Sequence, residues 1–104
     1  MSLEKQLEAY SDRHRDEVLL VHATIDGEPD LVMIFRGFSS SLMRATAYDP
    51  DIPVLPDSAV IDTIDRVNSP YIPEAPDYLE QGIPSDRFLA DYINAIDINA
   101  IDEN

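Results

Sequence analysis

The sequence predicts a small α+β domain that is mostly β: an antiparallel curled sheet or partly open barrel of three to five strands, with an N-terminal and a C-terminal helix. Three observations lead to this fold class. Apolar residues alternate at the period of a β-strand through much of residues 17–67. Stripes with the period of an amphipathic helix occur near the two ends. Most of the eight prolines lie from residue 50 onward, where they interrupt regular elements.

The first elements follow from local patterns. Residues 2–15 carry a narrow apolar stripe that predicts a short docking helix, and residues 17–25 alternate as a strand. Asp26-Gly27 then predicts a tight hairpin turn, because glycine accepts positive φ. A second strand is predicted over residues 31–38, with these side chains on one face: Val32, Ile34, Arg36 and Phe38. Both strands are apolar on two sides near their middles, which suits a pair covered on both faces.

The middle of the chain is less regular. Residues 42–48 are a candidate for an irregular third strand, and the three prolines of residues 49–56 favour an extended surface segment. Residues 59–67 predict another strand, for which the pattern leaves the phase of the inward face open. Residues 76–81 fit one or two helical turns with a proline near the start.

The C-terminal residues 85–97 predict an amphipathic helix with Ser85 as its N-cap. Residues 93–97 are repeated in tandem as residues 98–102, which indicates a helical extension or a loose tail. We therefore expect one domain over residues 1–104, made of a β core (17–67), a proline-rich wrap (68–84), the C-terminal helix (85–97) and an extension or tail (98–104).

The amino-acid composition limits the kinds of function that the protein can have. The chain has 21 acidic and 7 basic residues and a formal net charge of −14, which disfavours nucleic acid and anionic membranes as partners without excluding nucleic acid. It has no cysteine, so disulfides and thiolate chemistry are excluded. No apolar run reaches the length of a membrane span or a signal-peptide core, so we expect a soluble, cytoplasmic protein without membrane contact.

The sequence shows no constellation of catalytic residues. Ser39 to Ser41 lack the glycine context of a nucleophile elbow, and the carboxylate pairs lack the spacing and glycine of a calcium loop. His22 is interpreted as a strand histidine, and only a deep pocket around it with a convergent carboxylate would indicate a base. We therefore predict that the protein is not an enzyme and has no metal site and no cofactor.

The segment from residue 31 to 48 is the longest stretch without an acidic residue. Around Arg36 it combines a guanidinium, a glycine and hydroxyls, which are groups used to bind anions. Alternatively, its arginines and Arg66 pair with the chain's own carboxylates, for which Asp62 and Asp65 are candidates. The candidate binding surface consists of Arg36, Phe38, Ser39, Ser40, Ser41, Arg44, Tyr48, Arg66, Tyr71 and Tyr78.

Four successive patterns resemble a small family of uncharacterised proteins of cyanobacteria and plant chloroplasts. They are the hairpin VLLVHATIDGEPDLVMIFRGFSSSL, the proline-punctuated DPDIPVLP, the strand AVIDTIDRV and the closing YLEQG. The resemblance covers about residues 17–83 and implies no activity and no catalytic residue. It implies a photosynthetic setting, either a bacterial cytoplasm or, for plant relatives, the plastid stroma.

Two functions remain. The first is a non-catalytic protein–protein interaction module, because aromatic residues favoured at interfaces lie in or beside proline-rich segments. The alternative is a small barrel that binds nucleic acid or a phosphate ligand through Arg36, Arg44 and Arg66. An apolar second face of the sheet, if exposed, would predict a homodimer.

Overall fold

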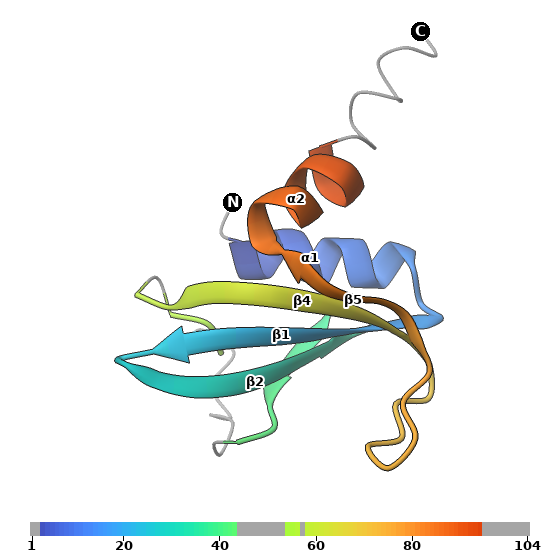
Figure 1. Cartoon of the computed structure of the whole chain (residues 1–104). Helices are drawn as coiled ribbons and strands as arrows, with labels where there is room; N and C mark the ends of the chain where they lie inside the picture. Colours follow the sequence, from blue (N-terminus) through green and yellow to red (C-terminus); the bar gives the residue numbers. More distant parts are fainter. Residues whose placement is uncertain (1–2, 44–53, 57, 95–104) are drawn as a thin grey trace, which may run out of the picture.

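The computed structural model describes residues 3–43, 54–56 and 58–94. In this part of the chain, five antiparallel strands form one open sheet in the order β3-β2-β1-β4-β5 (Figure 1). The strands are β1 (Glu17–Ile25), β2 (Glu28–Phe35), β3 (Phe38–Ser41), β4 (Val60–Asn68) and β5 (Tyr78–Pro84). The predicted fold class is confirmed in its open form, since the described strands do not close into a barrel.

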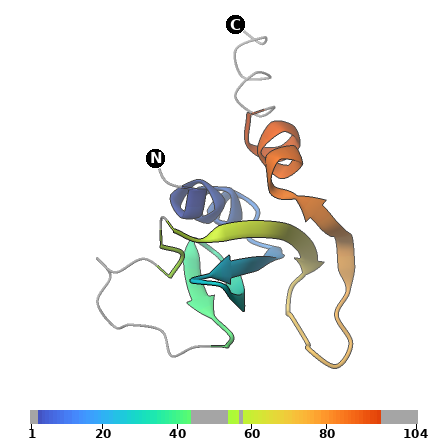
Figure 2. The ribbon, with the colours of Figure 1, turned by 60° about the vertical axis from the view of Figure 1, so that its left-hand side comes forward.

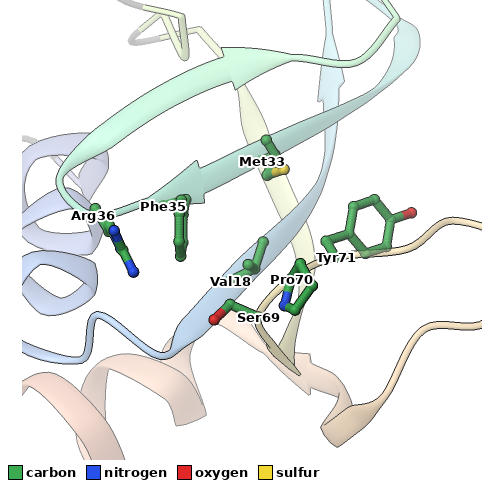
Figure 3. Close-up of a pocket in the computed structure, with 7 residues that line it drawn as sticks. All are labelled: Val18, Met33, Phe35, Arg36, Ser69, Pro70 and Tyr71. Atoms are coloured by element: carbon green, nitrogen blue, oxygen red, sulfur yellow. The ribbon is translucent and has the colours of Figure 1, made fainter.

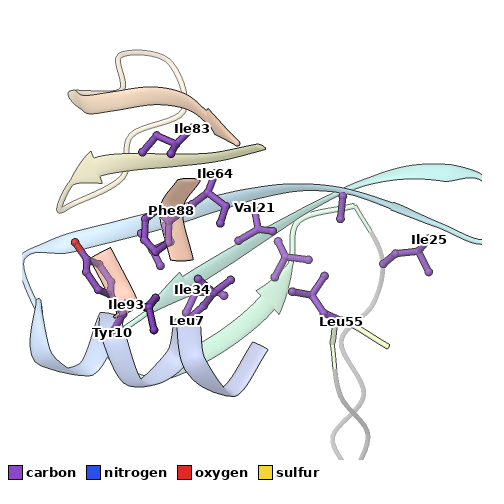
Figure 4. Packing of buried hydrophobic residues seen from close by; sticks show 13 residues of the cluster. Leu7, Tyr10, Val21, Ile25, Ile34, Leu55, Ile64, Ile83, Phe88 and Ile93 are labelled. Atoms are coloured by element: carbon purple, nitrogen blue, oxygen red, sulfur yellow. The ribbon is translucent and has the colours of Figure 1, made fainter. Parts of the chain in front are cut away.

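The helices cover one face of this sheet. α1 (Leu3–Arg13), the short α2 (Ser85–Phe88) and the π-helical segment η1 (Leu89–Asn94) lie on the same side (Figures 1 and 2). Because strand side chains point to the two faces in turn, alternate sheet residues pack against these helices. The main core formed in this way is shown in Figure 4 and includes Leu7, Tyr10, Val21, Ile34, Ile64, Ile83 and Phe88.

Two tight turns of the same kind connect the first three strands. Asp26-Gly27 has φ angles of 53° and 81°, and Arg36-Gly37 has φ angles of 50° and 85°. Positive φ at both central residues is typical of the type I′ hairpin turn, whose twist matches that of the flanking strands. The first turn confirms the prediction. The second shows that the strand predicted over residues 31–38 is confirmed only up to Phe35 and that its predicted end is wrong: β2 ends at Phe35, the chain reverses, and Phe38 begins β3.

The prediction of helical turns over residues 76–81 is also wrong, because these residues lead into and form β5. Tyr78 lies opposite Val67, and Glu80 lies opposite Arg66. Hydrogen bonding to the neighbouring strand outweighs the local preference here, since strand formation depends on cross-strand packing more than on intrinsic propensity.

β4 follows neither of the two phases that its pattern allows. Ile61 and Ile64 both contact the main core, while Val60 is exposed. The pairing of β1 with β4 shifts register between His22 and Ala23, so one extra residue of β4 is accommodated. A bulge of this kind leaves no clear signal in an alternating apolar pattern.

The C-terminal helix starts differently from its prediction. Pro84 is the N-cap and makes no side-chain cap hydrogen bond, so Ser85 is the first helical residue instead of the cap. Of the expected helix over residues 85–97, the part up to residue 94 is described. The rest of it, the tandem copy after it, and the strand candidate at residues 42–48 from residue 44 onward lie outside the described residues.

Candidate binding groove

The face of the sheet opposite the helices, which we call the second face, carries its own apolar cluster. Val18, Leu20 and Val67 are buried in it. The partly buried residues packed against them are Leu31, Met33, Phe35 and Tyr71. The connection between β4 and β5 lies on this side of the sheet (Figures 1 and 2) and supplies Tyr71. Both faces of the central strands are therefore apolar, as the sequence pattern indicates.

A groove of about 400 Å³ opens between β2 and the start of the β4–β5 connection. Val18 lies between its two sides in Figure 3, with Phe35 and Met33 on one side and Pro70 and Tyr71 on the other. The complete lining is Val18, Met33, Phe35, Arg36, Ser69, Pro70 and Tyr71. The connection is anchored at its start, because the backbone N–H of Ser69 donates to the carbonyl of Asp16 at 2.9 Å.

The second face is more open beside the groove, over β2 and β3. Phe38 lies opposite Phe35 across the hairpin, and its side chain is 78% exposed. The backbone N–H of Leu42 donates to the carbonyl of Leu31 at 2.8 Å, which extends the pairing beyond β3, and the Leu42 side chain is exposed. We call Leu31, Met33, Phe35, Phe38 and Leu42 together the apolar strip.

Arg36 stands at the end of the groove, in the turn between β2 and β3. Its guanidinium carbon lies 4.8 Å from the centre of the Phe35 ring, a cation–π contact. Its Nε donates to the carbonyl of Arg15 at 3.3 Å. No carboxylate in the described part of the chain forms an ion pair with it, and nearby Asp12 pairs with Arg15 at 2.7 Å instead. The guanidinium is thus held in position, and its terminal N–H groups have no hydrogen-bond partner among the described residues.

Arg66 pairs with carboxylates of its own chain, which is one of the two interpretations that the sequence allows for the arginines. Its Nε and one terminal nitrogen donate to the two carboxylate oxygens of Glu17 at 2.9 and 3.1 Å, and the other terminal nitrogen donates to the Tyr92 hydroxyl at 3.1 Å. Glu80, which accepts a hydrogen bond from Tyr92, lies 3.6 Å from the Arg66 guanidinium. Arg66 faces the helices, so it does not join Arg36 in one cationic surface.

This network sets the protonation of its members. Burial alone would raise the pKa of Glu17, but hydrogen bonds from Arg66 and from the Tyr10 hydroxyl outweigh it and lower the pKa below its ordinary value of 4.5. Burial first, and then the Glu17 carboxylate, raises the pKa of Tyr10, so this hydroxyl stays protonated and donates. The arrangement joins α1, β1 and β4 through charged hydrogen bonds.

The carboxylates named in the sequence as partners for the arginines bind other groups. Asp62 accepts a hydrogen bond from the Thr24 hydroxyl at 3.0 Å. Asp65 is buried, lies 2.7 Å from Nε2 of His22 and accepts the backbone N–H of Gly82 at 2.8 Å. The expectation that Asp62 and Asp65 pair with the arginines is therefore wrong for Arg36 and Arg66, because the strand register brings other groups to them.

His22 meets one of the two requirements for a catalytic base, which are a deep pocket and a convergent carboxylate. Asp65 is a convergent carboxylate, but the imidazole is 46% exposed and is not part of the lining of the groove. A half-exposed imidazole is in contact with solvent, whereas acid–base catalysis relies on a site that holds the substrate and excludes water. The geometry of the described residues thus gives no support to acid–base catalysis at His22.

The remaining predicted site residues are divided between the two faces. The hydroxyls of Ser39 and Ser41 donate to Glu8 at 2.7 Å and to Asp30 at 2.9 Å, while Ser40 lies opposite Met33 on the second face. Tyr71 lines the groove, and Tyr78 is exposed on β5. Arg44 and Tyr48 lie outside the described residues.

Several groove residues were absent from the predicted surface: Val18, Met33, Phe35, Ser69 and Pro70. The signal for two of them, Met33 and Phe35, is present in the sequence, because they alternate with Leu31 along a strand that is apolar on both sides. The groove also depends on the fold of the β4–β5 connection, which leaves the second face open beside β2. Local periodicity carries no information about that placement.

No helix in the described part of the chain is long and apolar enough to cross a membrane. Comparison with curated proteins gave no significant match, and neither did comparison with solved structures. A family profile, in contrast, matches residues 4–92, which include all five strands, both sides of the groove and Arg36. The chain therefore belongs to the DUF7734 family, a domain of unknown function.

Proposed function

We propose that this protein is a non-catalytic module that binds a protein partner on the second face of its sheet. The observation that carries the proposal is the apolar strip, which ends in a phenylalanine whose side chain is 78% exposed. Large apolar side chains gathered beside a concave groove are the usual centre of a protein interface. Burying them against a partner removes apolar surface from water, which is the main driving force of protein association.

The position of the groove supports the same function. Its centre is Val18, a buried residue of β1, and one of its sides is formed by Met33 and Phe35 of β2, so the sheet supplies much of the groove. Rigid apolar pockets with a few polar groups at the rim are the sites in which anchor residues of a partner are held.

The alternative of nucleic-acid or phosphate binding loses one of its three arginines. Arg66 is already bonded to Glu17 and faces the helices, away from Arg36. The formal charge of −14 opposes a polyanion further. The resemblance to proteins of cyanobacteria and chloroplasts adds the expectation that the partner belongs to a photosynthetic cell, with the module in its cytoplasm.

The experiment that tests this proposal places a photo-crosslinking amino acid at Phe38 in the full-length protein expressed in its native cells. We expect ultraviolet light to give an adduct of defined mass, because the exposed ring at this position would lie in the interface. Lys5 of α1, whose side chain is 65% exposed on the helix-covered side of the sheet, provides the matched control position. An adduct from Phe38 alone supports the proposal, and one formed with a second copy of the chain identifies the partner as itself. Equal adducts from both positions, or none, contradict it.

A further inference from the structure

We infer that the segment docking on the second face carries a carboxylate beside a large apolar side chain: Arg36 binds the carboxylate while the apolar side chain fills the groove. This inference rests on the proposed function and specifies the chemistry of the partner. It is drawn from three features of Arg36, namely its free N–H groups, its strained backbone and its place at the rim of an apolar cavity.

The first feature is that Arg36 has no carboxylate partner among the described residues of a chain that has three acidic residues for every basic one. In the described part, Lys5, Arg15, Arg66 and Arg87 each pair with Asp or Glu. Arg13 also lacks such a pair there, but it lies in the last turn of α1, where a cation complements the helix dipole. Arg36 has no comparable role within the fold.

The free groups of Arg36 have the geometry that carboxylates require. Only Nε is used, by the Arg15 carbonyl, so both terminal nitrogens are available among the described contacts. The cation–π contact with the Phe35 ring, together with the hydrogen bond of Nε, restrains the guanidinium. A planar guanidinium held in this way binds a carboxylate through two parallel hydrogen bonds, which gives it a preference for Asp, Glu or a chain terminus over other groups.

The second feature is the backbone of Arg36. Its φ of 50° lies in the left-handed region, which glycine, asparagine and aspartate adopt far more readily than arginine. The equivalent position of the other hairpin turn is occupied by Asp26, with φ of 53°. Arginine is thus present where the turn itself favours a shorter residue. Residues held in such conformations concentrate at binding sites, where the side chain is what is needed.

The third feature is the neighbourhood. Arg36 and Phe35 line the groove together with Met33 and Val18, so a guanidinium and an apolar cavity are presented side by side (Figure 3). A partner residue that filled only the cavity would leave the guanidinium partly desolvated and unpaired, which is unfavourable. An acidic residue next to the apolar one satisfies both halves of the site.

The negative charge of the chain does not prevent this contact. Charges more than about 8 Å apart are largely screened at physiological salt, whereas groups in direct contact inside a groove are screened much less. The charge of −14 therefore slows the approach of an acidic segment more than it weakens the bound state.

The test uses the full-length protein as bait for a display library of random peptides. We expect the selected peptides to share an Asp or Glu close to Phe, Leu, Ile or Met, and selection with the Arg36→Asn variant to lose the acidic preference. Apolar peptides without an acidic residue would overturn the inference while leaving a protein-binding face in place. A failure to select any peptide would also overturn it, whereas the proposed function is tested separately by crosslinking at Phe38.

Affinities of one selected peptide then show whether Arg36 contacts the carboxylate directly. We expect Arg36→Asn to weaken binding about tenfold or more, and the peptide in which the acid is replaced by its amide to weaken it similarly. Combining both changes should cause no further loss, because they remove the same interaction. Arg13→Gln, which removes a charge outside the groove, should leave the affinity unchanged. Additive losses, or an equal loss with Arg13→Gln, would show a general charge effect and overturn the inference. Thermal unfolding verifies that each variant is folded.

Discussion

Arg36 and Asp26 occupy the same position in two turns of the same type, and they differ in how well they suit it. A residue with a long side chain in the left-handed region costs about 1–2 kcal/mol, and asparagine or aspartate costs less. We therefore expect Arg36→Asn to raise the free energy of unfolding by about 0.5–1 kcal/mol. Urea denaturation measures the change.

Gly37→Ala is the control for this prediction, because it should lower the free energy of unfolding. Gly37 has a φ of 85°, and a Cβ added there would lie 3.5 Å from Cβ of Asp12, an ordinary contact distance. The expected loss of about 1–2 kcal/mol therefore comes from the backbone alone. If Arg36→Asn also destabilised the fold, the arginine would contribute to stability, and the argument from its strained conformation would be wrong.

These two turns also show what the sequence reveals at this scale. Asp26-Gly27 is among the strongest local hairpin signals, and it was predicted with the correct strand before it. Arg36-Gly37 forms the same turn but escapes recognition, because arginine is uncommon at its first position. The candidate site is predictable only in part. Arg36 can be recognised from the sequence because it lies in a stretch without acidic residues. The groove beside it cannot, because distant segments of the chain bring its residues together.

The network of Glu17, Arg66 and Tyr10 predicts a pH dependence. Since the pKa of Glu17 is lowered in the folded state, its contribution to stability is fully present above 4.5 and is lost as the pH falls below that value. Glu17→Gln should cost about 2 kcal/mol near neutral pH, because charged hydrogen bonds are replaced by neutral ones. The difference between variant and wild type should shrink on acidification. Urea denaturation across this pH range tests it, and a difference that stays constant contradicts the assignment.

At the scale of elements, one phenylalanine belongs to the core and another to the proposed binding surface. Phe88 of α2 is fully buried between the sheet and Tyr10, whereas Phe38 at the start of β3 is 78% exposed. Phe88→Ala should destabilise the protein by about 3–5 kcal/mol. Phe38→Ser should change stability by no more than about 0.5 kcal/mol. Thermal unfolding of both variants checks this, and a large loss with Phe38→Ser would mean that the exposed ring is part of the core.

The elements themselves were predictable to different degrees. β1 was located correctly because it alternates apolar residues without interruption, and the N-terminal helix because its stripe is regular. β5 was missed, since Gly82 and the surrounding prolines resemble the boundaries of a helical turn. What holds residues 78–84 in a strand is pairing with β4 and the hydrogen bond from Gly82 to Asp65, both of which depend on tertiary structure.

At the scale of the whole molecule, a formal charge of −14 coexists with an open apolar strip. Repulsion between copies of such a charge opposes association, whereas the strip favours it. The two effects respond differently to salt: screening shortens the range of repulsion from about 10 Å at 0.1 M to about 3 Å at 1 M, and sulfate strengthens apolar burial. The balance between them is therefore open to measurement.

We expect the wild-type protein to sediment as a monomer in dilute neutral buffer and to self-associate in about 1 M sodium sulfate, where repulsion is screened and apolar contact is favoured. The double variant Met33→Gln/Phe38→Ser should remain monomeric in both conditions, because it removes apolar surface from the strip without altering the net charge. Val60→Ser, which removes an exposed valine elsewhere on β4, should behave as the wild type. Sedimentation velocity measures all three proteins. If the double variant associated to the same extent as the wild type, the strip would not be the surface through which copies associate. The partner's docking site would then lie on another part of the molecule.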